Sequence, residues 1–296
     1  MAGMATITLD EIERHHPDVL LPPDPEFAED YAAAVRAGRE AAKQRSIAFV
    51  MICRNSQPWL ERTLAALEKT GDCFASWQAF AFENDSQDDT KEVLSAWSDG
   101  RQRHVSLNTN HRPHLNYTID PVRTHALAEY RAACQTFVRN GEPVDYVAVL
   151  DSDSWGGWSI DGLMTSVAHM EQSDWWGLGA YSWCEMRANG GAIIPAHYDG
   201  FAFRWFGWQH RTPLDWFHLM RPPIGAPPVP VNSAFGQLAL YRADAYLRGV
   251  YTGETCEHCT LHKSIAEHPE TQGRFGFNPA MRVVSFWIPR EVPSGG

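Results

Sequence analysis

The sequence predicts an α/β fold in which a mostly parallel central sheet is flanked by helices. Apolar segments alternate with helix-like segments through the first half of the chain, which is the pattern of a parallel sheet with right-handed crossovers. Several of the apolar runs are nearly continuous, as expected for strands covered on both faces. The chain has 296 residues, 44% of them hydrophobic, and it shows no internal repeat or clear linker. We therefore predict one large domain.

The first 45 residues precede this alternating pattern. Residues 23–45, "PDPEFAEDYAAAVRAGREAAKQR", are rich in Ala, Glu and Arg and predict an amphipathic helix. We expect residues 1–45 to form a peripheral N-terminal helical extension and residues 46–290 to form the main domain.

The alternation itself runs from residue 46 to residue 153. A helix is predicted over residues 57–71, with Pro58 near its start and Gly71 at its end. The other predicted helices cover residues 88–100 and 120–141. The predicted strands cover residues 46–55, 77–86, 103–110 and 145–153.

The pattern becomes irregular after residue 158. A long stretch dense in aromatic residues, Gly and Pro is more often a binding region than a linker. The segment "NSAFGQLALYRADAYLRG", residues 232–249, then predicts a strand followed by a helix. Residues 254–268 predict another helix, and residues 281–289 predict a last strand.

Composition and charge exclude several classes of protein. The formal net charge of −11 argues against a protein whose main task is to bind nucleic acid. No apolar run reaches membrane-spanning length, and the N-terminus lacks the basic start and apolar core of a signal peptide. We therefore expect a cytoplasmic protein without a membrane span. Its six scattered cysteines are then expected to be free thiols.

Two carboxylates alternate at the end of the strand "DYVAVLDSD". Asp151 and Asp153 are two residues apart, so both can reach one cation at the end of a strand. Hard oxygen ligands suit Mg²⁺ or Mn²⁺, which often bind substrate phosphates at the same time. The alternative is a solvated Asp-Ser-Asp turn that caps the next helix. We favour the metal site because ligands bind beyond the carboxyl ends of parallel strands.

Other polar residues are expected at the same edge of the sheet. Arg54 ends the first strand, and Glu83 and Asp85 end the second, where an acid could hold a ribose hydroxyl or a base edge. Arg123, at the start of the third helix, could neutralise a diphosphate. The alternatives are a simple turn for the acids and a surface ion pair for Arg123.

The segment "CEHCTLH" forms a second cluster. On a helix, His258 and His262 share one face while Cys256 and Cys259 lie on a rotated one, which argues against a structural zinc site. Glu257 beside His258 suits acid–base chemistry. The alternative is a helix start with Glu in its first turn and packed histidines.

Taken in order, these segments resemble one family. "VMICRN", "FENDSQDDT", "ALAEYRAAC", "VAVLDSDSWGG", "NSAFGQLALYR" and "CEHCTLH" follow the motif order of GT-A-type glycosyltransferases over roughly Ile47 to Met281. Within the family, the motifs resemble those of the capsule mannosyltransferases of the cryptococcal type and of bacterial enzymes with a C-E-H segment. The resemblance implies a GT-A-like domain, with a nucleotide-binding half at 46–158 and an acceptor-binding half at 159–290.

The resemblance also implies roles for particular residues. Asp151 and Asp153 match the D-x-D motif that holds Mn²⁺ or Mg²⁺ and the diphosphate of a UDP- or GDP-sugar. Glu257 and His258 fall where many members carry Glu-Asp, so either could be the catalytic base. His262 is the candidate for the family's C-terminal metal-binding histidine.

The resemblance places Glu83 and Asp85 where the family's second strand meets the donor nucleotide. Together with Arg54 and Arg123 from the predicted edge, and Asp151, they make up the expected nucleotide-binding residues. Residues 233–242 match the strand that lines the sugar and acceptor side.

Two other functions stay open from the residues alone. A nucleotidyltransferase also holds a nucleotide and a metal on an α/β sheet, but "CRNSQPWL" lacks the Gly-rich phosphate loop such enzymes use. A non-catalytic carbohydrate-binding protein would explain the twelve tryptophans but leaves the D-x-D motif without a role. The acceptor is expected to be a hydroxyl of a glycan or small molecule. The acidic charge disfavours a modified nucleic-acid base.

Overall fold

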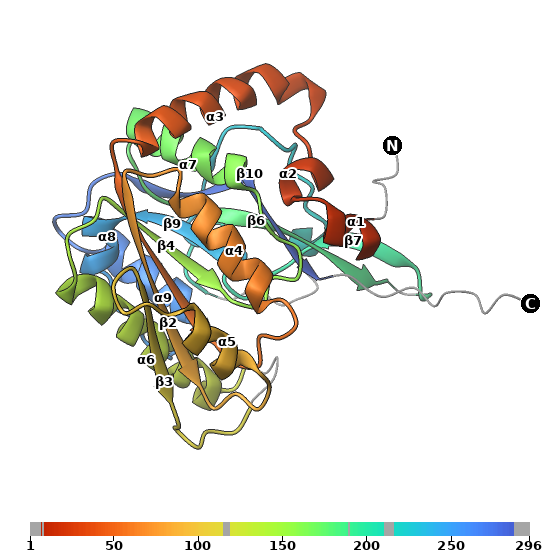
Figure 1. The fold of residues 1–296 in the computed structure, drawn as a ribbon. Coiled ribbons are helices and arrows are strands. Elements are labelled where there is room, and N and C mark those ends of the chain that lie inside the picture. The colour runs from red at the N-terminus through yellow and green to blue at the C-terminus, as the bar shows by residue number, and fades with distance from the viewer. Residues whose placement is uncertain (1–6, 8, 115–118, 189, 210–215, 287–296) are drawn as a thin grey trace, which may run out of the picture.

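The computed structural model confirms an α/β fold with a mostly parallel central sheet between helices (Figure 1). It describes residues 7, 9–114, 119–188, 190–209 and 216–286. The outer ends of both predicted regions, residues 1–6, 8 and 287–290, lie outside the described residues.

The predicted alternation of strands and helices is present in the first half of the chain. The helical elements are α1 (Leu9–Arg14), α2 (Pro17–Leu20), η1 (Pro25–Phe27), α3 (Ala28–Ala42), α4 (Leu60–Gly71), α5 (Thr90–Trp97), α6 (Pro121–Asn140), α7 (Ile160–Gln172), η2 (Trp216–Leu219), α8 (Ala243–Arg248) and α9 (Glu257–Ala266). The strands are β1 (Ser46–Cys53), β2 (Ser76–Asn84), β3 (Arg103–Asn108), β4 (Tyr146–Asp151), β5 (Gly157–Trp158), β6 (Trp175–Arg187), β7 (Ile193–His197), β8 (Val229–Pro230), β9 (Leu238–Arg242) and β10 (Arg274–Phe286).

Within the described residues, these strands form one sheet in the order β3-β2-β1-β4-β9-β6-β10-β5, with β7 beside β6 and β8 beside β10. The ladders β3-β2, β2-β1, β1-β4 and β6-β10 are parallel. Strand β9 lies antiparallel between β4 and β6, so the main strands on both sides of it run in the same direction. The carboxyl ends of β1, β2 and β4 therefore lie at one edge.

Helices cover both faces of the sheet. Along β1, Ala48 and Val50 face a core that α6, α8 and α9 complete, whereas Phe49 and Met51 face a core that α4 and α7 complete. Figure 1 shows these two groups of helices on opposite sides of the strands. Alternate residues of one apolar run thus serve two cores, which explains why the run contains no polar position.

The N-terminal segment packs closely against the main domain. Ile7, Ile12 and Leu21 are buried, and α2 packs against α7, β5 and β10. Helix α3 packs along α7, where Gly38 allows the two backbones to approach closely: a Cβ atom there would lie 1.8 Å from the carbonyl oxygen of Met164. The helix expected over residues 23–45 is present as α3 and forms an outer layer of the fold, packed over α7 (Figure 1). The division of the chain at residue 45 stays a prediction.

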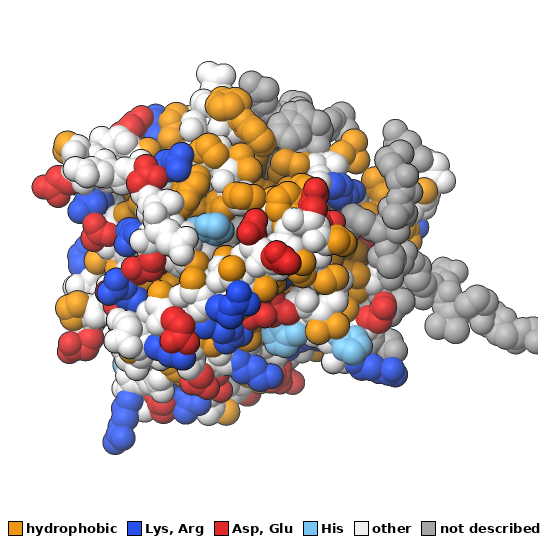
Figure 2. Space-filling model, turned by 90° about the horizontal axis from the view of Figure 1, so that it is seen from above, with side chains coloured by type: hydrophobic (Ala, Val, Ile, Leu, Met, Phe, Trp, Pro, Cys, Tyr) orange, Lys and Arg blue, Asp and Glu red, His pale blue; other side chains and the backbone are white. Residues whose placement is uncertain are grey.

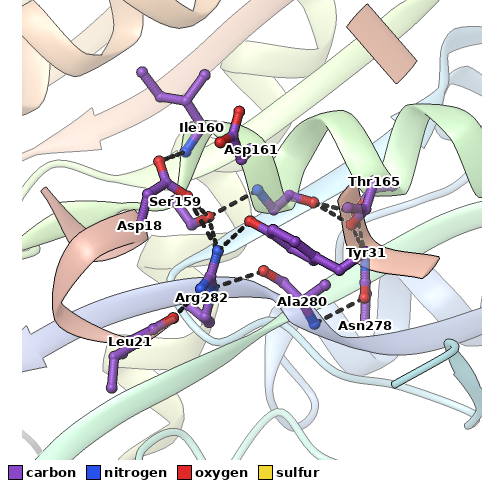
Figure 3. A network of polar contacts seen from close by, with 12 residues as sticks. Asp18, Leu21, Tyr31, Ser159, Ile160, Asp161, Thr165, Asn278, Ala280 and Arg282 are labelled. Carbon is purple, nitrogen blue, oxygen red and sulfur yellow. Dashed lines mark hydrogen bonds and ion pairs between the residues drawn. The ribbon is translucent and has the colours of Figure 1, made fainter. Parts of the chain in front are cut away.

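A buried polar network joins this segment to the last strand (Figure 3). Arg282 of β10 is fully buried and contacts Asp18 at 3.0 Å and the hydroxyl of Tyr31 at 2.6 Å. Ser159, the N-cap of α7, bonds to Asp18, whose other oxygen accepts the backbone N–H of Ile160 at 3.1 Å. A buried guanidinium needs such partners to offset its desolvation, so the network fixes the N-terminal segment on the domain.

The second half of the chain is more regular than the sequence indicated. Helix α7 and the long strand β6 lie within the stretch expected to be irregular. The six cysteines are free, as predicted. Among the described residues, no helix has the length and apolar character needed to cross a membrane.

Candidate functional site

The edge formed by the carboxyl ends of β1, β2 and β4 brings the predicted acids together. In the parallel ladders, Ile52 of β1 pairs with Asp151 of β4, and Cys53 pairs with Glu83 of β2. Because the strands are in register, the polar residues that follow each of them meet at the same edge.

Asp151 is held by a buried arginine from α6. Arg131 is 1% exposed; one of its Nη atoms pairs with Asp151 and the other donates to the carbonyl of Leu150 at 3.0 Å. Although burial opposes the charged form, the carboxylate of Asp151 raises the pKa of Arg131. The guanidinium thus remains charged, and it fixes one oxygen of Asp151.

Asp153 lies beyond the end of β4, with its side chain accessible to solvent. Many protein atoms nonetheless surround it, and this partial loss of hydration, followed by repulsion from Asp151, raises the pKa of Asp153 to about 6. One oxygen of Asp153 accepts a bond from Nε2 of Gln237 at 3.3 Å. Two mutually repelling carboxylates at a strand end are a site where a cation would be stabilising.

A strained turn, residues 235–237, supports both acids. Gly236 and Gln237 have φ angles of 62° and 65°, and a Cβ atom on Gly236 would lie 2.4 Å from the carbonyl oxygen of Ala180. Glycine is therefore required at position 236. The carbonyl of Gln237 accepts the backbone N–H of Asp151 at 3.0 Å. The turn thus fixes the point where the main chain leaves β4.

Glu257 and His258 begin helix α9, and both are buried. Burial raises the pKa of Glu257; Arg131 opposes this rise and Asp151 adds to it. Arg131, which pairs with Asp151, also lies over the ring of Phe235, and that ring stacks on His258, so the start of α9 is near the two aspartates. A carboxylate with a raised pKa and little hydration is suited to accepting a proton.

His258 has a different environment. Its ring stacks on Phe235 with the centroids 3.6 Å apart, and Nε2 lies 3.4 Å from an oxygen of Glu257. Neither ring nitrogen makes a hydrogen bond within the described residues. Burial, and then the charge of Arg131, lower the pKa of His258 well below its usual value, so the ring is neutral.

His262 does not reach the site as a ligand. Its Nδ1 lies 2.8 Å from Oγ of Ser233, its Nε2 lies 2.8 Å from the hydroxyl of Tyr241, and its side chain is fully buried. Burial lowers the pKa of His262 to about 3. With both nitrogens engaged in the core, His262 has no lone pair free for a cation, and we omit it from the metal site proposed below.

The two acids that follow β2 are engaged in local structure. Oε1 of the buried Glu83 accepts the backbone N–H of Ser86 at 2.7 Å, whereas its other oxygen has no partner among the described residues. Asp85, at φ 55°, accepts backbone N–H bonds from residues 110–112. Burial acts in the opposite direction, but these bonds lower the pKa of Asp85. Asp85 therefore shapes the loop beside the site.

The two candidate arginines, Arg54 and Arg123, differ in their surroundings. Arg54 donates to the carbonyls of Arg112 at 2.8 Å and Pro113 at 3.2 Å, so it also stabilises that loop. Arg123 is half-buried, and its charge lowers the pKa values of Asp153 and Glu257 against their larger upward shifts from burial. Arg123 is therefore close enough to the two-aspartate site to act on it electrostatically.

Asp199, which the sequence reasoning missed, is a further acid at this site. It follows β7 at φ 70° and accepts the backbone N–H groups of Gly236 at 3.1 Å and Ala202 at 3.3 Å. Burial, with a smaller contribution from Asp151, raises the pKa of Asp199 to about 7. The dipeptide "DG" reads as an ordinary turn, so only the fold reveals its position.

The carboxylate oxygens at this site fit a hard divalent cation. Asp151 and Asp153 offer carboxylate oxygens, and their mutual repulsion would be relieved by a bound charge. No group of three His, Cys, Asp or Glu side chains able to hold a metal occurs in the part of the chain that the structure describes. Two carboxylates alone are typical of ions whose remaining ligands are water and substrate phosphates.

Comparisons with known proteins agree with this fold. No family model and no curated protein matches the chain. Its structure is similar to that of GalNAc-T7 with UDP, GalNAc and Mn²⁺, at a TM-score of 0.50 and 12% identity over 92% of this chain. The chain spans 55% of the length of that protein. The likeness confirms the GT-A-like architecture.

Two other solved structures are similar at lower scores. The mannosyltransferase PcManGT from Pyrobaculum calidifontis, in complex with GDP-Man and Mn²⁺, gives a TM-score of 0.47 at 14% identity over 92% of this chain and 68% of its own. Residues 1–349 of TarS from S. aureus give 0.47 at 10% identity over 82% of this chain and 60% of their own.

Proposed function

We propose that the protein is a metal-dependent glycosyltransferase that moves a sugar from a UDP- or GDP-sugar to an acceptor hydroxyl. The observation that carries this proposal is the convergence of Asp151, Asp153 and Glu257 at the carboxyl edge of a GT-A-like sheet. A cation-binding pair and a buried carboxylate of raised pKa are the two groups that such a transfer needs.

Each residue of the site has a separate proposed role. Asp151 and Asp153 would hold Mn²⁺ or Mg²⁺, which supplies the positive charge that stabilises the departing diphosphate. Arg131 keeps one oxygen of Asp151 in place through their ion pair. Arg123 adds a second positive charge toward the diphosphate.

Glu257 is the proposed base. It would accept the proton of the acceptor hydroxyl, since its buried carboxylate gains from neutralisation. His258, neutral and stacked on Phe235, would orient Glu257 through the 3.4 Å contact. We therefore propose the carboxylate of Glu257, and not His258, as the base, and we propose Glu83 and Asp85 as supports of the nucleotide side.

The acceptor is proposed to be a glycan or small-molecule hydroxyl. Figure 2 shows acidic and basic side chains mixed on one face of the molecule, around a hydrophobic centre, without a basic field. That distribution, with the net charge of −11, does not favour nucleic acid. The finer likeness to cryptococcal capsule mannosyltransferases rests on motif order and stays part of the proposal.

A donor panel tests the proposal directly. The protein is incubated with UDP- and GDP-sugars and Mn²⁺, and release of free nucleoside diphosphate is measured. A glycosyltransferase transfers the sugar of at least one donor to an added hydroxyl acceptor or to water and so releases nucleoside diphosphate. EDTA should stop this release. Release of pyrophosphate from a nucleoside triphosphate and a sugar phosphate would instead identify a nucleotidyltransferase.

A further inference from the structure

Gln237 carries an unused hydrogen-bond acceptor at the two-aspartate site. Its side chain is only 6% exposed, at the start of β9, and Nε2 donates to Asp153. The carbonyl oxygen Oε1 of the same amide is buried and has no partner within the described residues. A buried carbonyl without a partner costs about 1–3 kcal/mol and is rare in folded proteins.

The position of this oxygen limits what could occupy it. A carbonyl oxygen accepts hydrogen bonds or coordinates a cation, so it repels phosphate oxygens and takes either an O–H or N–H donor or the metal itself. In a nucleotide sugar, the transferred sugar is attached directly to the diphosphate and carries hydroxyl groups. A diphosphate bound at Asp151 and Asp153 therefore places sugar hydroxyls near Gln237.

We propose that Gln237 recognises the donor sugar, with its amide carbonyl accepting a hydrogen bond from a hydroxyl of the transferred sugar. This inference rests on the proposed function and adds a specificity residue to it. The bond from Nε2 to Asp153 is long, at 3.3 Å, and the terminal torsion of Gln is soft. When Asp153 turns to a cation, the amide of Gln237 can rotate and expose Oε1 to the sugar.

The surrounding turn is built to hold this side chain in place. The backbone of Gln237 is fixed by its bond to Asp151, and Asp199 holds the preceding Gly236 at 3.1 Å. A left-handed φ of 65° is costly for Gln, and such strain is typical of functional positions. The fixed backbone limits the freedom of Gln237 to its side-chain torsions, so Oε1 has a defined place beside Asp153.

The test compares two ligands that differ only by the sugar. Binding of a nucleoside diphosphate and of its nucleotide sugar is measured by calorimetry with Mn²⁺, using UDP with UDP-N-acetylglucosamine and GDP with GDP-mannose as probes. Gln237→Met removes the acceptor, and Gln237→Asn withdraws it while tolerating the left-handed backbone. Gln78→Met is the matched control, because Gln78 lies near the start of β2, at the end of that strand away from the carboxyl edge.

We expect both Gln237 variants to weaken nucleotide-sugar binding about fivefold or more relative to diphosphate binding, the effect of one lost hydrogen bond. Gln78→Met should change neither. Equal losses for the two ligands would overturn the inference, because Gln237 would then serve only Asp153 or a metal-bound water. Unchanged binding, or a wild type that never distinguishes sugar from diphosphate, would also overturn it. A wild type that binds no diphosphate refutes the proposed function itself.

Discussion

Replacing Asp199 by Asn is expected to stabilise the protein at pH 8 but not at pH 5. Burial raises the pKa of Asp199 from 3.8 in the unfolded chain to about 7 in the fold. Between these values the folded state binds more protons than the unfolded one. Its contribution to stability is therefore complete below about pH 4 and is lost as the pH rises through about 7.

The size of this loss follows from the shift. About three pKa units correspond to at most ~4 kcal/mol, and because the side chain keeps partial access to solvent we expect roughly half of that. Asparagine keeps an acceptor for Gly236 but gives up the 3.3 Å bond from Ala202, which costs about 0.5–1 kcal/mol. The net gain at pH 8 is then about 1 kcal/mol.

Urea unfolding at pH 5 and pH 8 measures this pH-dependent change in the free energy of unfolding. The free energy of unfolding of Asp199→Asn, relative to wild type, should rise by about 1 kcal/mol between the two pH values, because at pH 5 the carboxyl is already ionised in the unfolded chain and part of the contribution is already lost. Asp99→Asn is the control: three backbone N–H bonds lower the pKa of Asp99, so its contribution is complete at both pH values and its variant should show no pH-dependent difference. If Asp199→Asn differs from wild type by the same amount at pH 5 and pH 8, the reasoning about its burial is refuted.

Three further variants probe the site. Arg131→Met should lower the free energy of unfolding by about 3 kcal/mol, since it leaves Asp151 without its buried partner, and Mn²⁺ should recover part of the loss in urea titrations. Gly236→Ala forces the turn to shift and should weaken Mn²⁺–nucleoside diphosphate binding by roughly tenfold or more in calorimetry, whereas wild-type affinity would show that the turn is not needed. Glu257→Gln should slow nucleoside diphosphate release by about a hundredfold with donor binding intact, and the wild-type rate should fall as the pH drops through the raised pKa of Glu257; normal turnover would exclude Glu257 as the base.

The fold was predictable where one pattern dominates. The run at Ile47–Cys53 is apolar at nearly every position because its two faces serve two cores, and the strand–helix alternation follows from it. Strand β6 was missed because aromatic residues and glycines fill it, as in "WWGLGAYSW", and because it is buried on both faces without a β-branched pattern.

The site was predictable where residues follow the strands directly. Asp151 and Asp153 come at the end of β4, at the edge that the topology dictates, whereas Glu257 begins α9 and its place depends on how that helix packs. Whether a side chain is free to bind a ligand depends on its hydrogen-bond partners, which the sequence does not show. His262 bonds to Ser233 and Tyr241 from distant segments, so a plausible ligand is a core residue instead.

The fit of the N-terminal segment and the role of Asp199 depend on long-range contacts. Arg282 binds Asp18 across most of the chain, and nothing in either local sequence indicates that pairing. Asp199 reaches the site because β7 folds back on β6 and brings the following turn against Gly236. Such convergence is a property of the tertiary structure.

The most direct test of the account is the cooperative binding of Mn²⁺ and a nucleoside diphosphate at Asp151 and Asp153. UDP or GDP together with Mn²⁺ should raise the melting temperature well above the sum of the shifts that each ligand gives alone, because each strengthens the binding of the other. The double variant Asp151→Asn/Asp153→Asn should remain folded and lose this cooperativity. Equal shifts with and without Mn²⁺, or a double variant that responds as wild type does, would contradict the assignment of the two aspartates as the metal and diphosphate site.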